Sequence, residues 1–131
     1  MPEYRGRQGG RHCFDDCTGR VIGAALAVHC ALGPGFLESI YQRALECELA
    51  VRGIRFESQV AVPVCYRGEA IGLHRLDLVV DRAIVVELKS VGALLDAHLA
   101  QLRSYLRAPE LRLGLLLNFN ASVLGIRRVV N

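Results

Sequence analysis

Hydrophobic residues recur at helical spacing in the first third of the chain. The apolar positions of residues 18–32 fit one helix, with Thr18 as its predicted N-cap. The Gly-Pro-Gly segment at residues 33–35 must break this helix, because neither residue type continues it well. A second helical pattern covers residues 36–51 and ends at Gly53, which suits a left-handed C-terminal cap. The pattern therefore predicts two consecutive helices.

The middle of the chain alternates between apolar and polar positions, as half-buried strands do. Two such segments, residues 59–66 and 70–80, are separated by an Arg-Gly turn at residues 67–68. A second tight turn at residues 81–82 leads into residues 83–88. Strands joined by short turns pair antiparallel, so these three segments are predicted to form an antiparallel meander.

The last third returns to helical spacing and then to strands. Residues 92–107 form a predicted helix that ends near Pro109. Residues 111–119 are almost continuously apolar, which is typical of a strand buried on both faces of a sheet. Residues 124–130 form a predicted final strand. The complete order is helix, helix, three strands, helix, strand, strand.

Composition indicates one globular domain. The chain has 131 residues, 52% of them hydrophobic, and no tryptophan, which indicates a self-sufficient aliphatic core. Residues 1–15 have little apolar patterning and three arginines, so we expect a flexible basic arm before a single domain over residues 16–131. The longest apolar run, residues 21–32, is shorter than the roughly 20 residues that cross a bilayer, so no membrane segment is expected.

Cysteine usage and the start of the chain bear on the cell compartment. The five cysteines are odd in number and scattered, which favours reduced thiols. No charged-then-apolar leader opens the chain, so a cytoplasmic location is expected. His12, Cys13 and Cys17 offer part of a zinc site as an alternative, but no second ligand pair at zinc-finger spacing follows them.

Charge usage singles out one residue. The chain has fifteen arginines and a single lysine, Lys89, at the end of the string Val-Val-Glu-Leu-Lys over residues 85–89. A lysine supplies a compact ammonium with an adjustable pKa, which a guanidinium does not. In an extended strand Glu87 and Lys89 project to the same face, so a carboxylate and an ammonium lie side by side. Asp77 precedes Glu87 by ten residues.

This arrangement resembles the PD-(D/E)XK nuclease superfamily. The likeness rests on the element order, with Asp77 on the second strand of the meander and Glu87-Leu88-Lys89 on the third. Leu76 stands where the superfamily often has proline, so the first half of the motif is imperfect. The resemblance implies an α/β fold with a restriction-endonuclease-like core, in which a mixed central sheet, the antiparallel meander plus further strands, is flanked by helices.

Two further motifs extend the resemblance. Gln101 and Tyr105 form Gln-x-x-x-Tyr on the helix after the motif strand, similar to a signature of the exonuclease branch of the superfamily. They lie one helical turn apart, and His98 joins them on that face. Residues 35–41 match the Gly-x-x-Glu-x-x-Tyr motif of a bacterial family, the GxxExxY proteins, and the likeness covers roughly residues 18–130.

The resemblance implies a site for Mg²⁺ or Mn²⁺, because phosphodiester cleavage uses hard divalent cations that take oxygen ligands. The implied metal ligands are Asp77, Glu87, the carbonyl oxygen of Leu88, and Glu38. Lys89 would orient or deprotonate the attacking water and stabilise charge on the phosphate. The implied catalytic set is Glu38, Asp77, Glu87, Lys89, Gln101 and Tyr105.

The function that follows is a divalent-metal-dependent nuclease, with DNA favoured over RNA as its substrate. A net charge of +3 permits a phosphate partner, and Arg103 and Arg107 are the predicted substrate-binding residues beside the site. A chain of 131 residues leaves little room for a recognition element, so a homodimer or a partner protein that supplies recognition is expected. The alternative is a non-catalytic nucleic-acid-binding or assembly module that keeps the nuclease fold.

Structural interpretations of the same residues stand beside the functional ones. Glu87 and Lys89 fit an exposed strand ion pair that contributes less than about 1 kcal/mol. Glu38 fits a first-turn acid that the helix dipole favours. The residues expected to have structural roles are Tyr41, with a bonded hydroxyl, His29 and His98, whereas His74 has no assignment.

Overall fold

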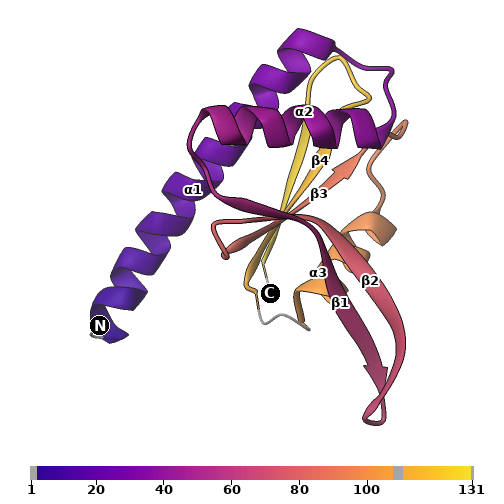
Figure 1. The fold of residues 1–131 in the computed structure, drawn as a ribbon. Helices are drawn as coiled ribbons and strands as arrows, with labels where there is room; N and C mark the ends of the chain where they lie inside the picture. The colour runs from indigo at the N-terminus through magenta and orange to yellow at the C-terminus, as the bar shows by residue number, and fades with distance from the viewer. Residues whose placement is uncertain (1–2, 108–110, 131) are drawn as a thin grey trace.

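The computed structural model describes residues 3–107 and 111–130, with side chains from residue 16 onward. Its elements follow the predicted order (Figure 1). The helices are α1 (Glu3–Leu32), α2 (Glu38–Val51) and α3 (Asp96–Arg107), and the strands are β1 (Phe56–Tyr66), β2 (Glu69–Val80), β3 (Ile84–Lys89), β4 (Leu113–Asn118) and β5 (Gly125–Val130).

The strands form one five-stranded sheet in the order β1-β2-β3-β4-β5. β1, β2 and β3 pair antiparallel, which confirms the predicted meander. β4 lies parallel to β3, a pairing that requires the crossover through α3, and β5 returns antiparallel to β4. Every residue of β4 is buried, as predicted for a strand covered on both faces. The fold is therefore α/β with a mixed central sheet, of the restriction-endonuclease type.

Helices cover both faces of this sheet (Figure 1). α1 and α2 pack on one face, where they form the α1/α2 core, and α3 packs on the other, where it forms the α3 core. The largest fully buried side chains of the α1/α2 core include Tyr41, Leu45, Leu49 and Phe119. The α3 core consists of Val62, Leu76, Val79, Val85, Leu102, Leu106, Leu116 and Val129.

Close packing fixes α3 against the sheet. A Cβ atom placed on Gly114 of β4 would lie 3.0–3.1 Å from side-chain atoms of Leu102 on α3. A larger residue at this position would push the helix away, so glycine allows the close approach. The approach determines how near α3 carries its Gln101 and Tyr105 side chains to the strands.

The first helix differs from the prediction. α1 begins at Glu3 and continues through Thr18, so Thr18 is not an N-cap, and residues 3–15 are helical where a flexible arm was predicted. A glycine inside a helix costs only about 1 kcal/mol, and no proline interrupts residues 3–32, so nothing in this stretch ends the helix. None of the helices in the described part of the chain combines the length and apolar character needed to cross a membrane.

The other helices start later than predicted, at residues 38 and 96 instead of 36 and 92. At the start of α3, Nδ1 of His98, the third helical residue, reaches back and accepts the Leu95 N–H at 2.9 Å, as the third-position side chain of a capping box does. α2 ends as predicted, with Gly53 at a φ of 70° and the Ile54 N–H donating to the Leu49 carbonyl. The predicted end of α3 near Pro109 falls outside the described residues.

Candidate functional site

β2 and β3 separate at one point of the sheet, and two carboxylates lie there. The last paired residues of their antiparallel ladder are Leu78 and Val86, and the next residues are Asp77 and Glu87. The Asp77 N–H donates to Glu87 Oε1 at 3.2 Å, and the Leu88 N–H donates to Asp77 Oδ2 at 2.9 Å. Each carboxylate thus accepts a backbone N–H that a carbonyl oxygen would accept in a regular ladder. The structure therefore places Asp77 and Glu87, which were predicted to act together, next to each other.

At Asp77 the side-chain alternation of β2 changes from one face of the sheet to the other. Leu78 belongs to the α1/α2 core, whereas Leu76, two residues away, belongs to the α3 core. Regular alternation would place both on one face. Opposite Asp77, Gln59 of β1 has a left-handed φ of 52°, and this pair is missing from the β1–β2 ladder although the register is the same on both sides of it. Local irregularities of this kind re-aim side chains beside functional sites.

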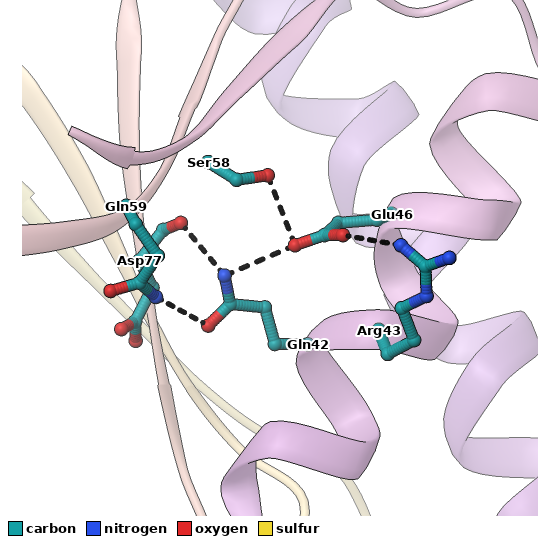
Figure 2. Close-up of polar contacts among 6 residues, drawn as sticks. All are labelled: Gln42, Arg43, Glu46, Ser58, Gln59 and Asp77. Atoms are coloured by element: carbon teal, nitrogen blue, oxygen red, sulfur yellow. Dashed lines mark hydrogen bonds and ion pairs between the residues drawn. The ribbon is translucent and has the colours of Figure 1, made fainter.

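Gln42 of α2 holds this irregularity in place (Figure 2). Its Nε2 donates to the Asp77 carbonyl and to Glu46 Oε2, each at 3.1 Å, and its Oε1 accepts from Gln59 Nε2 at 3.0 Å. The sequence analysis missed Gln42, whose only signal is its position one helical turn after Glu38. Gln42 fixes Asp77 through the backbone, so the carboxylate is left for other partners.

Glu87 is a buried carboxyl group, with 7% of its surface exposed. Burial is the main cause that raises the pKa of Glu87 from 4.5 to about 8. Repulsion by Asp77 raises this pKa further, and the positive charge of Lys89 acts against both effects. Glu87 therefore retains a proton at neutral pH in the metal-free protein. A cation beside it would favour the ionised form.

Lys89 follows Glu87 on the same face of β3, half-buried. Its ammonium is in no ion pair within the described part of the chain, where the ion pairs are Arg43–Glu46, Arg52–Glu48 and Arg55–Asp81. The interpretation of Glu87 and Lys89 as an exposed ion pair is therefore wrong. A lysine in this state keeps its hydrogen-bond donors available for a ligand.

α3 brings two predicted residues to the same place. Tyr105 packs against the α3 core, and burial is the main cause that raises its pKa. The negative charge of Glu87 raises the pKa of Tyr105 further, and a hydrogen bond with Gln101 opposes this, so Tyr105 lies near both side chains. Arg103 and Arg107 lie exposed on the same helix, one turn apart.

His74 is a site residue that the sequence analysis left unassigned. Its ring stacks on Tyr105, with centroids 3.4 Å apart and planes at 17°. Its Nε2 atom is buried and has no hydrogen-bond partner among the described residues. Burial lowers the pKa of His74; the charge of Asp77 raises it and that of Lys89 lowers it. The one available signal was its spacing of two from Leu76, which puts both on the α3 side.

Asn118 supports the segment that follows Lys89. This buried side chain accepts the Val91 N–H at 3.1 Å and donates to the Val91 carbonyl at 3.0 Å. Ser90 donates to the carbonyl of Phe36 at 2.6 Å, which ties the same segment to the start of α2. The sequence signal for Asn118 was a polar residue inside a long apolar run.

Glu38 lies on the α2 flank of this arrangement. It is exposed and, with Ser90, lines a cavity of about 590 Å³. In the described ranges, no group of three or more His, Cys, Asp and Glu side chains is arranged to hold a metal ion. The structure therefore does not gather Glu38 into a cluster with Asp77 and Glu87, and its position in the first turn of α2 also suits the helix dipole.

Tyr41, His29 and His98 were expected to have structural roles, and each of them makes a structural contact. Tyr41 is fully buried, stacks on Phe119, and donates its hydroxyl hydrogen to the Gly33 carbonyl. Nε2 of His29 lies 2.7 Å from a backbone carbonyl of the β4–β5 loop. His98 caps α3. These contacts anchor the loops around the site and the start of α3.

The oxygen atoms at the strand separation suit a hard divalent cation. The carboxylates of Asp77 and Glu87 are adjacent. The Leu88 N–H points to Asp77, and because the N–H and C=O of one strand residue lie on the same side, its carbonyl faces that way too. Cations such as Mg²⁺ bind through one or two carboxylates and keep several waters, so this donor set fits.

Comparisons with known proteins agree with this geometry. A family model described as the PD-(D/E)XK nuclease superfamily matches residues 15–129. A solved structure described as "Crystal structure of SSO0001" has a TM-score of 0.58 and 22% sequence identity, which is a likeness of fold. The match covers 71% of this chain and 49% of that one, so this chain spans about half its length. No curated protein sequence matches. Since the family model spans nearly the whole sequence, the chain belongs to the PD-(D/E)XK nuclease superfamily.

Proposed function

We propose that this protein is a divalent-metal-dependent nuclease that hydrolyses phosphodiester bonds in nucleic acid, with DNA favoured over RNA. The observation that carries the proposal is the contact between Asp77 and Glu87 where β2 and β3 separate, with Lys89 next on the same face. Membership of the superfamily supports this class of chemistry. The motif at residues 35–41 adds a likeness to the GxxExxY proteins.

Asp77, Glu87 and the carbonyl oxygen of Leu88 would hold Mg²⁺ or Mn²⁺, which when bound supplies Lewis acidity and an activated water. Glu38 is the additional carboxylate in this proposal. It lies one turn before Gln42, which contacts the Asp77 carbonyl, so both project from the α2 face that is turned to β2. The two motif carboxylates would hold the cation, and Glu38, which does not form one cluster with them, would contribute from the α2 flank.

Lys89 orients or deprotonates the attacking water and stabilises the negative charge that develops on the phosphate. Lys89 is half-buried, and its ammonium is in no ion pair among the described residues, which suits both tasks. Gln101 and Tyr105 position the phosphate, or the lysine itself, by hydrogen bonds. His74 stacks on Tyr105 and limits the movement of its ring.

The exposed side of α3 suits an extended anionic ligand. Arg103 and Arg107 lie one turn apart and exposed on the helix that carries Gln101 and Tyr105. Guanidinium groups bind phosphate oxygens through two donors at once. In this proposal the two arginines bind the nucleic-acid backbone beside the bond that is cleaved.

A second function, nucleic-acid binding or assembly without catalysis, is favoured by one observation. Only two acidic side chains meet at the strand separation, and the described residues hold no larger metal-binding group. A binding module of this kind would keep the contacts of Arg103 and Arg107 and show no turnover.

Cleavage assays of the purified full chain test the proposal. Single-stranded DNA, duplex DNA and RNA are incubated with Mn²⁺ or Mg²⁺. Asp77→Asn keeps an oxygen that can accept the Leu88 N–H but loses the negative charge, so it abolishes cleavage in a folded protein. The matched control Glu57→Gln makes the same change of charge at an exposed position of β1 and keeps wild-type activity. Cleavage that survives Asp77→Asn contradicts the assignment, and wild-type binding without cleavage selects the binding module.

A further inference from the structure

A cavity of about 590 Å³ lies between the segment that leads into α2, the end of β3 and the β4–β5 loop. Ser90, which directly follows Lys89, lines this cavity, and Glu38 lines it from α2. The Ser90 hydroxyl donates to the Phe36 carbonyl at 2.6 Å, so the start of α2 and the end of β3 are tied together there. Figure 1 shows these two segments close to each other. The cavity therefore adjoins the candidate site at the residue next to the lysine.

An aromatic ring is presented at this cavity. Phe36 lines it and is 45% exposed. The ring of Phe36 meets the buried ring of Tyr41 almost perpendicularly, at 82°, with centroids 5.9 Å apart. A perpendicular contact covers either an edge or one face of a ring. At least one face of Phe36 is therefore not covered by Tyr41, and another planar group can stack on it.

The backbone of Phe36 is held before any ligand binds. Its N–H donates to the Tyr41 hydroxyl oxygen at 3.1 Å, and its carbonyl accepts from Ser90. Tyr41 is itself fully buried and donates to the Gly33 carbonyl. A ring carried on a backbone that is already fixed loses little freedom when a ligand binds to it.

A phosphate group does not suit this cavity. Among the described residues that line it, none is Arg, Lys or His. Glu38 contributes a carboxylate, which repels an anion. Because Glu38 lies in the first turn of α2, it also offsets the positive end of the helix dipole, which would otherwise attract a phosphate. The favoured occupant is a neutral group.

Two further polar side chains suit the edge of a nucleobase. The Ser39 hydroxyl and the side-chain amide of Asn120 belong to residues that line the cavity, and within the described part of the chain neither group makes a hydrogen bond. A hydroxyl and an amide can each donate and accept, and the edges of bases present both donors and acceptors. A nucleobase is a flat neutral group with such an edge, and it can stack on the ring of Phe36.

We propose that this cavity binds one unstacked base of the nucleic acid, with Phe36 as its stacking platform. This binding mode rests on the function proposed above, and it narrows the substrate class. Stacking on aromatic side chains holds single strands with little regard to sequence. A base inside a duplex is already stacked between its neighbours and must leave the stack to reach such a ring. The substrate is therefore single-stranded, or unpaired, beside the bond that is cleaved.

Binding of fluorescent oligonucleotides to the full chain, measured by anisotropy without added metal, tests this assignment apart from cleavage. One probe is single-stranded oligothymidylate, and the other is an abasic strand of equal length with the same phosphates. The wild type is expected to bind the first about tenfold more tightly. Phe36→Ala should abolish this preference, as should Phe36→Leu, which keeps an apolar contact with Tyr41 but has no ring. Phe36→Trp should keep it.

The matched control is Tyr66→Ala, which removes another exposed aromatic ring, at the end of the hairpin, and leaves the preference unchanged. Circular dichroism checks that each variant keeps the fold. The salt dependence of binding should be the same in Phe36→Leu as in the wild type, because no phosphate contact is lost. A wild type that binds both strands equally, or a preference that survives in Phe36→Leu, overturns the base site and leaves the nuclease proposal standing. A wild type that binds neither strand overturns both.

Discussion

The two faces of the central sheet are built differently. The α1/α2 core contains nineteen of the described buried side chains, and its rings are hydrogen-bonded, Tyr41 to Gly33 and His29 to the β4–β5 loop. The α3 core contains eight, and it borders the polar groups of the candidate site. There Glu87 is buried beside another acid, and the Nε2 atom of His74 has no partner among the described residues.

This difference separates the sources of stability and function. The larger core can hold the fold by burial of apolar surface, which is the dominant favourable term in folding. The smaller side tolerates a buried carboxyl group with a raised pKa, whose ionised form a bound cation would favour. Substitutions on the two faces should therefore affect different measurements.

The largest effect is expected from Lys89 on activity. If Lys89 orients or deprotonates water, Lys89→Arg should lower kcat by roughly 100-fold to 10,000-fold, nearly as much as Lys89→Ala. A planar guanidinium that never deprotonates does not replace a compact ammonium. The measurement is kcat with Mn²⁺ on the substrate that the wild type cleaves.

The control for this prediction is Arg43→Lys, an exchange of the same two cations on the exposed face of α2, which should leave kcat unchanged. The melting temperature of Lys89→Arg should stay near that of the wild type, because Lys89 has no ion pair to lose within the described chain. Near-normal turnover with arginine would reduce Lys89 to a positive charge without a role in proton transfer.

A substitution in the α1/α2 core should lower the free energy of unfolding and leave kcat nearly unchanged. Leu45 on α2 is fully buried, so Leu45→Ala should lower the free energy of unfolding by about 2–5 kcal/mol. Leu37→Ala, at a residue that is 75% exposed, should change it by less than about 0.5 kcal/mol. Urea denaturation measures both values. The folded fraction of Leu45→Ala should keep nearly wild-type kcat, and a large loss of kcat at full folding would break the separation of the two faces.

The contact between Asp77 and Glu87 could be predicted from the sequence because it depends on local rules. A tight turn at residues 81–82 fixes the antiparallel register of β2 and β3, and the two acids then follow the last pair, Leu78 and Val86. The strand β4 was equally predictable, because a continuous apolar run permits few other environments.

The features that escaped prediction depend on contacts between distant segments. The left-handed φ of Gln59 has no mark in the sequence, because it is accompanied by a hydrogen bond to Gln42 on another element. The stacking of His74 on Tyr105 depends on how closely α3 approaches the sheet, which Gly114 allows. Helix periodicity and strand alternation do not contain this information.

The smallest effect we predict is the pH dependence that Glu87, on the α3 face of the sheet, gives to the free energy of unfolding. The pKa of Glu87 is raised from 4.5 to about 8 in the folded protein. Between these two values the folded state holds a proton that the unfolded state has released, so the contribution of Glu87 to stability is complete below pH 4.5 and is lost as the pH rises to about 8. Glu87→Gln removes this dependence because the amide does not titrate.

Relative to the wild type, metal-free Glu87→Gln should therefore gain about 2–3 kcal/mol of stability when the pH is raised from 6 to 8.5, as measured by urea denaturation at both values. The matched control Glu57→Gln, at an exposed carboxylate, should show no such change.

The effect of Mn²⁺ on the melting temperature is a second measurement on the same two proteins. A cation that binds only the folded state stabilises it by about 2.7 kcal/mol at a hundredfold excess over its dissociation constant. That should raise the melting temperature of the wild type by roughly 10 °C, more at pH 8.5 than at pH 6, because protons compete with the cation for Glu87. The rise should be much smaller in Glu87→Gln. If the two proteins respond alike to pH and to Mn²⁺, the carboxyl groups of Asp77 and Glu87 do not act as a pair, and the binding module becomes the better account of this site.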